Sequence, residues 1–453
     1  MIMQRYIIAR VFLTALLLSA VSCSQPEEGQ EQTGVMTGSV IFIHPDGAGG
    51  AMWTAMRALN YGPDSLSEWD RLAHMGQYRS HQRNSISTTS HAGATAHAYG
   101  VKVDRDTYGS VPAKPVRSAS GKNVSIMTEA LNAGKAVAVI NSGHLCEPGT
   151  GVFLASAFSR SAHDSITVQI IESGADIILG GGEVMLLPEG VVGRHGVEGR
   201  RKDGRNLIEH AKSLGYMVVY DREELMALPD TASRVLGVFA AWHTFNDMSE
   251  EDLAAGGLPM YNAGAPTIAE MTEKTLQLLE TKKKDFLLVV EEEATDNFSN
   301  DNNAAGALEA LRRADLAIGA ARRFVEQHPN TLLITAADSD AGGMGIWAPE
   351  RWDVTSVDFQ QPLPSTAENG APLDGVSGAG TPPFIAAPDA NGRRLPFGIS
   401  WAAYGDLGAG VLSKAHGANA DQLPVNVDNT DIYRLMYLTL FGAWPEAGAP
   451  RMR

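Results

Sequence analysis

The fold class is decided by three consecutive segments, DFLLVVEEE (285–293), GALEALRRADLAIGAARRFVEQ (306–327) and TLLITAADSD (331–340). The first and last are short apolar runs of the kind that form buried β-strands. The middle segment repeats apolar residues every three or four positions, as an amphipathic helix does. A strand, a helix and a second strand in this order are typical of two parallel strands joined by a crossover helix.

The same alternation runs along most of the chain. Helix-length amphipathic stretches also stand at 206–215 and 267–282, and 341–400 is expected to be a long, irregular excursion over the sheet. Further apolar runs lie at 39–46, 135–143, 175–182, 216–221, 235–240 and 408–415. This pattern predicts an α/β protein, a three-layer α/β/α sandwich with a large, mostly parallel central sheet covered on both faces. We expect 38–453 to form a single catalytic domain.

Composition and charge exclude some classes of protein. The 453 residues include 36 Lys and Arg against 52 Asp and Glu, a net charge of −16. A nucleic-acid-binding face is not expected, because such faces cluster Lys and Arg to neutralise phosphates. The two cysteines cannot form a disulfide scaffold, so stability has to come from a hydrophobic core.

The first residues are typical of an export signal. An apolar run at 11–21 is too short to span a membrane, and it leads to LSAVSC (18–23), which resembles the cleavage site of bacterial lipoproteins. We expect a lipoprotein-type signal peptide at 1–22 and a flexible polar tether at 23–37. The mature protein would then be periplasmic or at the outer membrane, anchored only by lipid on Cys23. An ordinary signal peptide with an incidental cysteine is the alternative.

Three of the apolar runs end in acidic residues, at Asp46, Glu291 and Asp338. Functional residues of parallel sheets gather beyond the carboxyl ends of the strands. Each acid alone could be a helix cap or a turn residue. Three of them on one edge would repel one another unless cations were bound. The sequence therefore predicts a cluster of divalent metal ions.

The segment SISTTSHAGATAHAYGVKV (85–103) contains a candidate nucleophile. Ser90 opens a run of Ala, Gly and Thr that predicts a thin helix able to pack closely against the sheet. Unpaired N–H groups at a helix start favour an anion and an activated alkoxide. The alternative is that Ser90 only caps the helix.

In combination, these segments resemble the alkaline phosphatases. The resemblance implies a metal-dependent phosphomonoester hydrolase that acts on a small-molecule phosphate ester through a phosphoserine intermediate on Ser90. It is also compatible with a homodimer. The matching segments occur in one order between 39 and 442 and include PDGAGG (45–50), the Ser90 helix, SITVQIIESGADIILGGG (165–182), FLLVVEEEATDNFSN (286–300) and DNTDIYRLM (428–436).

The resemblance also implies roles for individual residues. Asp46 would bridge two metal ions, Asp338 would hold the ion that activates Ser90, and Asp296 would hold the ion that binds the ester oxygen. Glu291 would bind a third ion, with magnesium expected there.

Two further roles follow from the resemblance. Glu147 or Thr150 would contribute to the third metal position, and Arg160 would grip the phosphate with two parallel hydrogen bonds. Thr89 stands where the family has an acidic residue, so Arg160 is expected to lack its usual orienting carboxylate.

Histidines that complete the metal sites in the family are replaced here by Ser339, Asn300 and Asp406. Oxygen donors suit magnesium, calcium or manganese, whereas zinc prefers nitrogen and sulfur. The ions at these two positions therefore remain open between zinc, calcium and manganese. Nearby histidines, above all His91 and His144, are an alternative source of zinc ligands.

The remaining histidines and the second cysteine are expected to be structural. His44 and His416 are weaker ligand candidates, His97 is expected to pack in the core, and Cys146 is expected to be a buried, inert thiol.

Two other functions stay open at this point. One is a phosphodiesterase or another phosphoryl or sulfuryl hydrolase of the same superfamily, because the altered metal ligands could change the substrate. The other is a non-catalytic surface lipoprotein that binds phosphate or calcium. Such a binding protein would not need Ser90 aligned with an arginine and metal ions.

Overall fold

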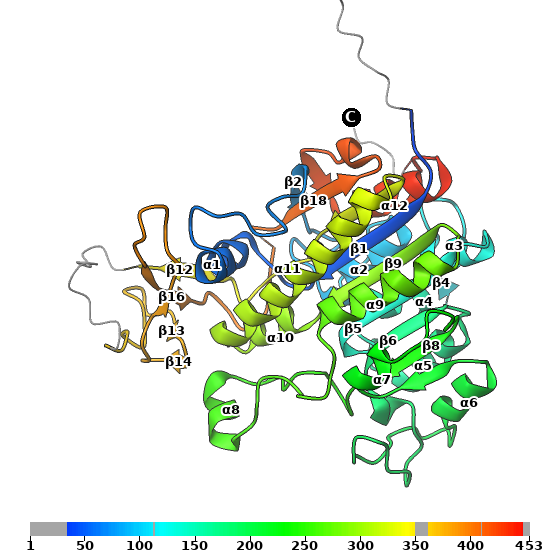
Figure 1. Ribbon diagram of the computed structural model, residues 1–453, viewed down its shortest axis with the longest axis horizontal. Coiled ribbons are helices and arrows are strands. Elements are labelled where there is room, and N and C mark those ends of the chain that lie inside the picture. The colour runs from blue at the N-terminus through cyan, green and yellow to red at the C-terminus, as the bar shows by residue number, and fades with distance from the viewer. Residues whose placement is uncertain (1–33, 112–113, 349–360, 409, 447–453) are drawn as a thin grey trace, which may run out of the picture. The chain divides into compact units, whose positions relative to one another are not determined.

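The computed structural model describes residues 34–111, 114–348, 361–408 and 410–446 (Figure 1). The expected signal peptide and the proposed lipid site at Cys23 lie outside these ranges, as does nearly all of the expected tether. Residues from Val35 onward form one compact unit.

A ten-stranded sheet forms the middle layer. Its strands lie in the spatial order β19 (Asn426–Asp428), β2 (His74–Arg79), β18 (Leu412–Gly417), β10 (Thr331–Thr335), β1 (Ser39–Pro45), β9 (Phe286–Glu292), β5 (Ala136–His144), β6 (Ile177–Gly181), β8 (Val235–Val238) and β7 (Met217–Val219). Only β18 runs antiparallel to its neighbours, β10 and β2. The prediction of a large, mostly parallel sheet is confirmed.

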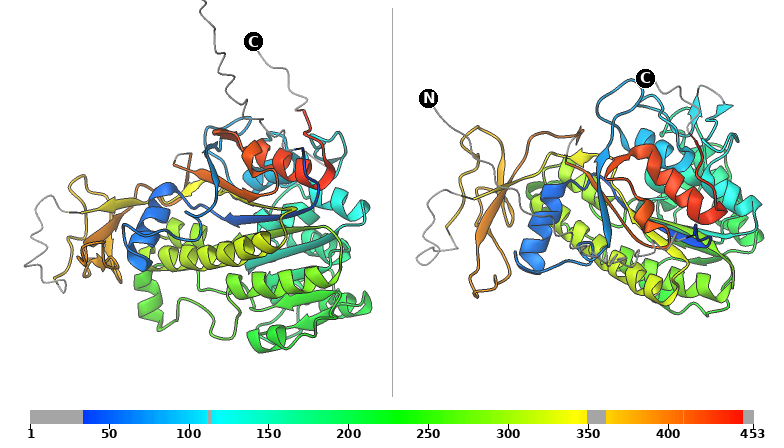
Figure 2. Two further views of the ribbon diagram at one scale, coloured as in Figure 1. Left: turned by 45° about the horizontal axis from the view of Figure 1, so that its top comes forward. Right: turned by 90° about the horizontal axis from the view of Figure 1, so that it is seen from above.

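Helices cover both faces of this sheet, which gives the three layers (Figures 1 and 2). One face carries α9 (Ile268–Thr281) and α11 (Ala304–Gln327). The opposite face carries α2 (Ser90–Tyr99), α3 (Ile126–Asn132), α4 (Pro148–Leu154) and α12 (Asn429–Phe441). The other helices are α1 (Gly50–Asn60), α5 (His163–Glu172), α6 (Leu207–Ser213), α7 (Arg222–Met226), α8 (Glu250–Gly256), α10 (Ala294–Asn300) and the short 3₁₀ turns η1 (Glu183–Met185) and η2 (Ala420–Gln422).

Local sequence explains where the covering helices begin. Thr267 and Glu270 form a reciprocal capping box at the start of α9, and the Asn303 side chain accepts the Gly306 N–H at the start of α11. Strand β1 is buried along its whole length, because helices pack on both of its faces. Within the described ranges, every helix is too short or too polar to traverse a lipid bilayer.

The stretch 341–400 differs from the irregular excursion that we expected. Its short strands β12 (Gly345–Trp347), β13 (Leu373–Gly375), β14 (Gly378–Ala379), β15 (Phe384–Ile385) and β16 (Pro396–Ser400) form a second, antiparallel sheet. This sheet lies beside α1 at the left of Figure 1 and does not lie over the central sheet. Because strands this short carry almost no alternating pattern, the sequence did not indicate them. Two smaller strand pairs join β3 (Ser110–Val111) to β4 (Lys114–Pro115) and β11 (Asp340–Ala341) to β17 (Asp406–Leu407).

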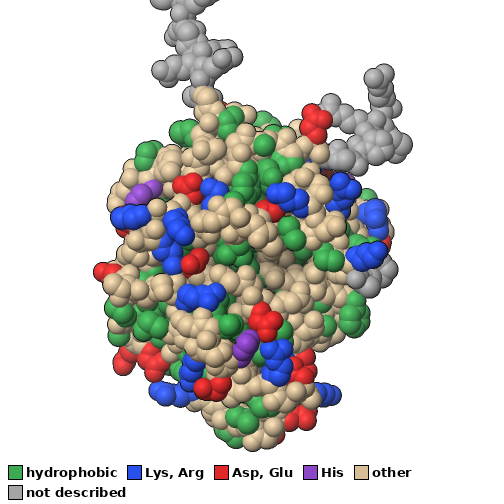
Figure 3. Space-filling model, turned by 90° about the vertical axis from the view of Figure 1, so that its right-hand side faces the viewer, with side chains coloured by type: hydrophobic (Ala, Val, Ile, Leu, Met, Phe, Trp, Pro, Cys, Tyr) green, Lys and Arg blue, Asp and Glu red, His purple; other side chains and the backbone are tan. Residues whose placement is uncertain are grey.

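The surface near α5 and α6 mixes charges of both signs. On the side of the molecule shown in Figure 3, Lys and Arg side chains lie interspersed with Asp and Glu side chains. This mixture is the pattern of an ordinary solvated surface.

Glu250, the first residue of α8, provides a test of stability against pH. Its Oε1 accepts the Ala305 N–H at 3.0 Å, its Oε2 is buried without a hydrogen-bond partner, and burial raises its pKa to about 8. The folded protein therefore keeps this proton while the unfolded chain releases it near pH 4.5, so stability falls as pH rises from about 4.5 to 8. We expect Glu250→Gln to stabilise the protein by about 1–3 kcal/mol near pH 9 and to have little effect near pH 5.

Urea unfolding of the variant and the parent protein at the two pH values measures this difference. Glu223→Gln, at an exposed position on α7, is the control. Equal effects of Glu250→Gln at both pH values would contradict the raised pKa.

Candidate active site

Acidic residues lie at or shortly after the carboxyl ends of three neighbouring strands in the middle of the sheet. Across β1 and β9, His44 pairs with Glu291, and across β1 and β10, Ile43 pairs with Thr335. Asp46 and Asp338 follow these strands at the same edge, and the side chains of all three acids are fully buried. The structure thus brings Asp46, Glu291 and Asp338 to one place, as the order of strands and acids predicted.

Several buried carboxylate oxygens at this place have no hydrogen-bond donor beside them. Both oxygens of Asp46, both of Asp338 and Oδ1 of Asp296 are buried and unpartnered among the described residues. Burial and the neighbouring carboxylates raise the pKa of Asp338 and of Asp296. Burial would also raise the pKa of Asp46, but His44, whose Nε2 lies 3.2 Å away, and other neighbours hold it below its ordinary value. Free, buried oxygens of this kind fit the ligand shell of divalent cations.

The residues that replace the family's metal histidines lie in the same place. The Asn300 side-chain amide donates to Asp296 at 2.9 Å, and the Ser339 hydroxyl donates to Asp406 at 3.1 Å. Pairing of β11 with β17 sets Asp406 opposite Ala341 and so carries it to the cluster. Hydrogen bonds from Ser339 and Asn300 oppose the burial that raises the pKa of Asp406. The three positions at which the family has histidines therefore offer oxygen donors, and the site is almost all oxygen, with His44 beside Asp46 as a nitrogen donor.

Ser90 stands at the first position of α2 and is buried against the cluster. Its hydroxyl lies beside Asp46 and is one of the neighbours that lower the pKa of that carboxyl. The helix can come this close because its residues are small. A Cβ atom at Gly93 would lie 2.5 Å from the Cβ of Asp338, closer than packed side chains allow. The expected close approach of this helix to the sheet is therefore confirmed.

Arg160 has a carboxylate partner that the sequence did not indicate. Its Nη2 lies 2.8 Å from Oε2 of Glu147, the residue just before α4. Although burial disfavours the charge of Arg160, Glu147 and further carboxylates raise its pKa. The usual acidic position before the nucleophile is still occupied by Thr89, but Arg160 has a different carboxylate partner in Glu147.

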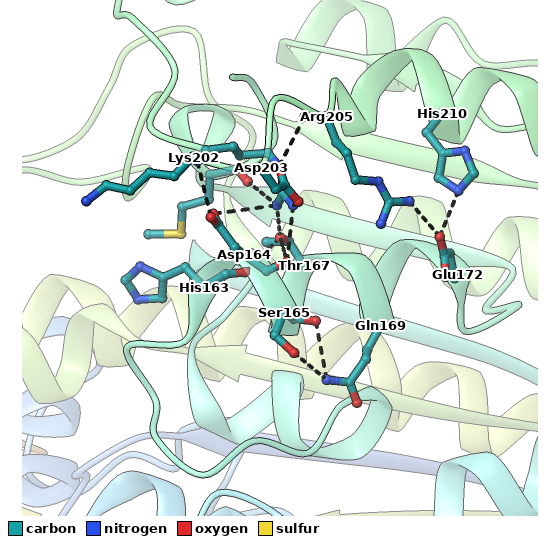
Figure 4. Close-up of polar contacts among 12 residues, drawn as sticks. His163, Asp164, Ser165, Thr167, Gln169, Glu172, Lys202, Asp203, Arg205 and His210 are labelled. Carbon is teal, nitrogen blue, oxygen red and sulfur yellow. Dashed lines mark hydrogen bonds and ion pairs between the residues drawn. The ribbon is translucent and has the colours of Figure 1, made fainter. Parts of the chain in front are cut away.

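Hydrogen bonds hold α5, the helix that follows Arg160. In Figure 4, polar side chains along α5 face the segment that carries Arg205. The fully buried Arg201 donates to the Thr167 hydroxyl at 2.5 Å and to the backbone carbonyl of Asp164 at 3.2 Å. At the other end of α5, Glu172 accepts a hydrogen bond from Arg205 at 2.8 Å. These contacts fix α5 and so limit the movement of the loop before it.

Glu291 has its own set of contacts at the edge of the sheet. It accepts hydrogen bonds from the Gly149 N–H at 2.9 Å and from the Thr150 hydroxyl at 3.2 Å. A side chain at Gly149 would collide with its carboxylate. His44, Asp46 and Glu291 each offer one ligand atom within 4.8 Å of the others. Of the two residues expected at the third metal position, Thr150 therefore contacts Glu291.

A second group of possible ligands surrounds Glu147. Its Oε1 lies 2.9 Å from Nε2 of His144 and 4.0 Å from Nε2 of His243. Burial and the nearby His144 lower the pKa of His243 to about 4, so its ring is neutral at neutral pH. The sequence did not indicate His243, because it lies in the apolar segment after β8 with no acidic residue beside it.

The other candidate residues for metal binding or proton transfer lie in the core, on β18 or next to Ser90. The His97 ring contacts the Tyr78 hydroxyl at 2.7 Å within the core, as expected of a packing residue. His416 lies on β18, and burial lowers its pKa. The Cys146 thiol is buried, and burial raises its pKa. His91 stays next to the nucleophile position, where burial and Arg160 lower its pKa to about 4.

Comparisons with known proteins point to one family. Residues 38–368 match the family model described as alkaline phosphatase. Alkaline phosphatase 4 of Bacillus subtilis (strain 168) is 27% identical over 354 residues, which cover 74% of this chain and 69% of the relative. The alkaline phosphatase of Escherichia coli (strain K12) is 26% identical over 339 residues, covering 66% of this chain and 69% of the relative.

Solved structures of alkaline phosphatases share the fold. The Thermus thermophilus enzyme has a TM-score of 0.69 at 24% identity and covers 90% of this chain and 92% of its own. The cold-active enzyme of Shewanella sp. has a TM-score of 0.66 at 23% identity, with 89% and 99% covered. A mutant of the TAB5 enzyme with Mg bound in its M3 site has a TM-score of 0.65 at 18% identity, with 90% and 99% covered.

Proposed function

The chain belongs to the alkaline phosphatase family, and from this premise we propose that it hydrolyses phosphate monoesters through a phosphoserine intermediate on Ser90. Membership makes it a metal-dependent phosphatase of this superfamily. The observation that carries the finer proposal is the position of Ser90, buried at a helix start beside Asp46 and a cluster of unpartnered carboxylate oxygens.

The donor set fits divalent ions, because its free oxygens have no other partner among the described residues. When bound, such ions would stabilise negative charge on the attacking and leaving oxygens. The residues that we propose as ligands in this oxygen centre are Asp46, Glu291, Asp296, Asn300, Asp338, Ser339 and Asp406, with Thr150 beside Glu291.

The residues of the chain supply the nucleophile and the phosphate clamp. In the first step, a bond forms between Ser90 Oγ and phosphorus while the bond from phosphorus to the ester oxygen breaks, and the serine proton ends on the leaving alcohol. In the second step, water attacks the phosphoserine, which releases inorganic phosphate and restores the hydroxyl. Arg160 is held by Glu147 and donates N–H groups to the non-bridging oxygens.

Substrate preference tests this proposal against the other hydrolases of the superfamily. We would compare kcat/KM for an aryl phosphate monoester, the matching diester and the matching sulfate, all with the same leaving group. A preference for the monoester of at least about 100-fold is expected, because divalent ions and Arg160 favour the dianionic monoester over the monoanionic diester and sulfate. Preference for the diester or the sulfate would contradict the proposal. Binding of phosphate without any turnover would indicate the non-catalytic protein.

Arg160 gives a prediction about the clamp. Loss of two charge-assisted hydrogen bonds in Arg160→Ala is expected to lower kcat/KM by about 100-fold or more. Arg160→Lys should fall within about tenfold of the alanine variant, since a single ammonium cannot replace the planar fork. Steady-state kinetics and competitive inhibition by inorganic phosphate measure both effects. Arg205→Lys, on the far side of α5, is the matched control. Full affinity for phosphate in Arg160→Lys would contradict a bidentate clamp.

We also propose that the protein is exported and anchored by lipid on Cys23, as the first 37 residues indicate. In a bacterial host, the protein is expected to incorporate labelled fatty acid and to sediment with membranes. Cys23→Ala should lose both properties. Membrane association that survives this substitution would contradict the lipid anchor.

A further inference from the structure

Two histidines and a glutamate form a cluster outside the oxygen centre. His144 ends β5, Glu147 precedes α4, and His243 lies in the segment after β8. Each offers one ligand atom, and these atoms lie within 4.8 Å of one another. The side chains are only 11%, 4% and 15% exposed, respectively. Residues from three separate elements therefore converge on one buried point.

Hydrogen bonds within the protein do not account for this convergence. The His243 Nε2 lies 4.0 Å from Glu147, which is too far for a hydrogen bond. Its Nδ1 is buried without a partner among the described residues, and so is Nδ1 of His144. The two rings stack with centroids 5.0 Å apart. An ion bound through the Nε2 atoms would leave these Nδ1 atoms unpartnered. The atom that calls for a further ligand is therefore Nε2 of His243, which faces Glu147 without a hydrogen bond among the described residues.

We propose that His144, Glu147 and His243 bind a transition-metal ion of the zinc class, at a site separate from the oxygen centre. Two imidazoles and one carboxylate form a ligand set that favours zinc and related ions over magnesium or calcium. Glu293 lies on the other side of Gly143 from Glu147. A Cβ atom at Gly143 would lie 2.9 Å from Cγ of Glu293 and 3.0 Å from Cγ of Glu147, so the two carboxylates flank this glycine. The Oε2 of Glu293 is buried and unpartnered.

The ion would act on the phosphate clamp through Glu147. One carboxylate oxygen of Glu147 faces the two histidines, and the other lies 2.8 Å from the Arg160 guanidinium. An ion held on the histidine side would fix this carboxylate and, through it, the arginine. Glu147 is then a positioning residue for Arg160. This second step rests on the proposed function, whereas the metal site itself does not.

Cobalt binding tests the site without any turnover. All metal ions are first removed from the protein, and Co²⁺ is then added. Co²⁺ bound through imidazoles with a low coordination number absorbs visible light strongly, whereas Co²⁺ in a six-coordinate oxygen site absorbs weakly. We expect the parent protein to show the strong band and His243→Ala to lose it. Zinc affinity at this site should fall by at least about 100-fold, since loss of a supporting partner alone costs up to that much. His210→Ala is the matched control, because this surface histidine also contacts a glutamate, Glu172, at 3.1 Å.

Several outcomes separate the parts of the proposal. An unchanged cobalt band and unchanged zinc stoichiometry in His243→Ala would overturn the metal site. His243→Gln serves as the second variant if the alanine variant does not fold. Weaker inhibition by inorganic phosphate in a variant that has lost one ion supports the coupling to Arg160, and unchanged inhibition would overturn that coupling. If the parent protein shows no phosphatase activity, the cobalt experiment still decides the site.

Discussion

Replacement of Ser90 by alanine is expected to lower kcat/KM for an aryl phosphate by roughly 10³-fold or more. The reason is that Ser90 forms the covalent bond to phosphorus, and its loss removes the two-step route. The fold and the metal content should not change, because the side chain becomes smaller by one atom inside a helix of small residues. Acid quenching during turnover should trap phosphate on Ser90, which mass spectrometry of the digested protein locates.

The control for this experiment is Ser87→Ala, three residues earlier in the loop that leads into α2. It should retain the activity of the parent protein. Activity of Ser90→Ala similar to that of the parent would remove Ser90 from the role of nucleophile.

Removal of divalent ions is expected to abolish hydrolysis, and magnesium, calcium or manganese should restore it at least as well as zinc. Asn300, Ser339 and Asp406 offer oxygen atoms, and oxygen ligands favour these harder ions. The double variant Asn300→His with Ser339→His should shift the preference toward zinc, because it adds two imidazoles to the centre. Activity after chelation and restoration with single ions measures both effects.

This experiment is best done with the His243→Ala variant, so that zinc bound by His144, Glu147 and His243 does not contribute to the response to zinc. Restoration by zinc alone, with no response to the harder ions, would contradict the assignment of an oxygen centre. The unaltered protein in the same assay is the control for the background substitution.

The middle of the sheet could be predicted because its strands are buried on both faces. Strands such as β1 and β9 are continuous apolar runs, and α9 and α11 show a clear helical period. Strand β2 could not be predicted. Its sequence HMGQYR is half exposed and includes a glycine, and it becomes a strand only because β18 and β19 pair with it.

The same distinction applies to the candidate site. Asp46, Glu291 and Asp338 were predictable because each lies at or shortly after the carboxyl end of an apolar strand. The contact of Arg160 with Glu147 depends on how α4 and the loop after it fold back. The position of His243 also depends on a tertiary contact.

A backbone hydrogen bond explains the position of His243. The Thr244 N–H donates to the Ser142 carbonyl at 3.0 Å and so ties the segment after β8 to the end of β5, although β6 lies between these strands. Neither residue type nor spacing in the sequence indicates such a bond, because it forms only when the sheet is assembled.

The place of β1 in the middle of the sheet has a consequence for biosynthesis. Both of its partners come late in the chain, since Val40 pairs with Leu287 of β9 and with Leu332 of β10. At ribosomal rates of about 5–20 residues per second, β1 waits on the order of 10–60 s for a partner. Throughout that time its apolar residues and both of its hydrogen-bonding edges are open to aggregation. The segment therefore stays unpaired until the second half of the protein is available to fold with it.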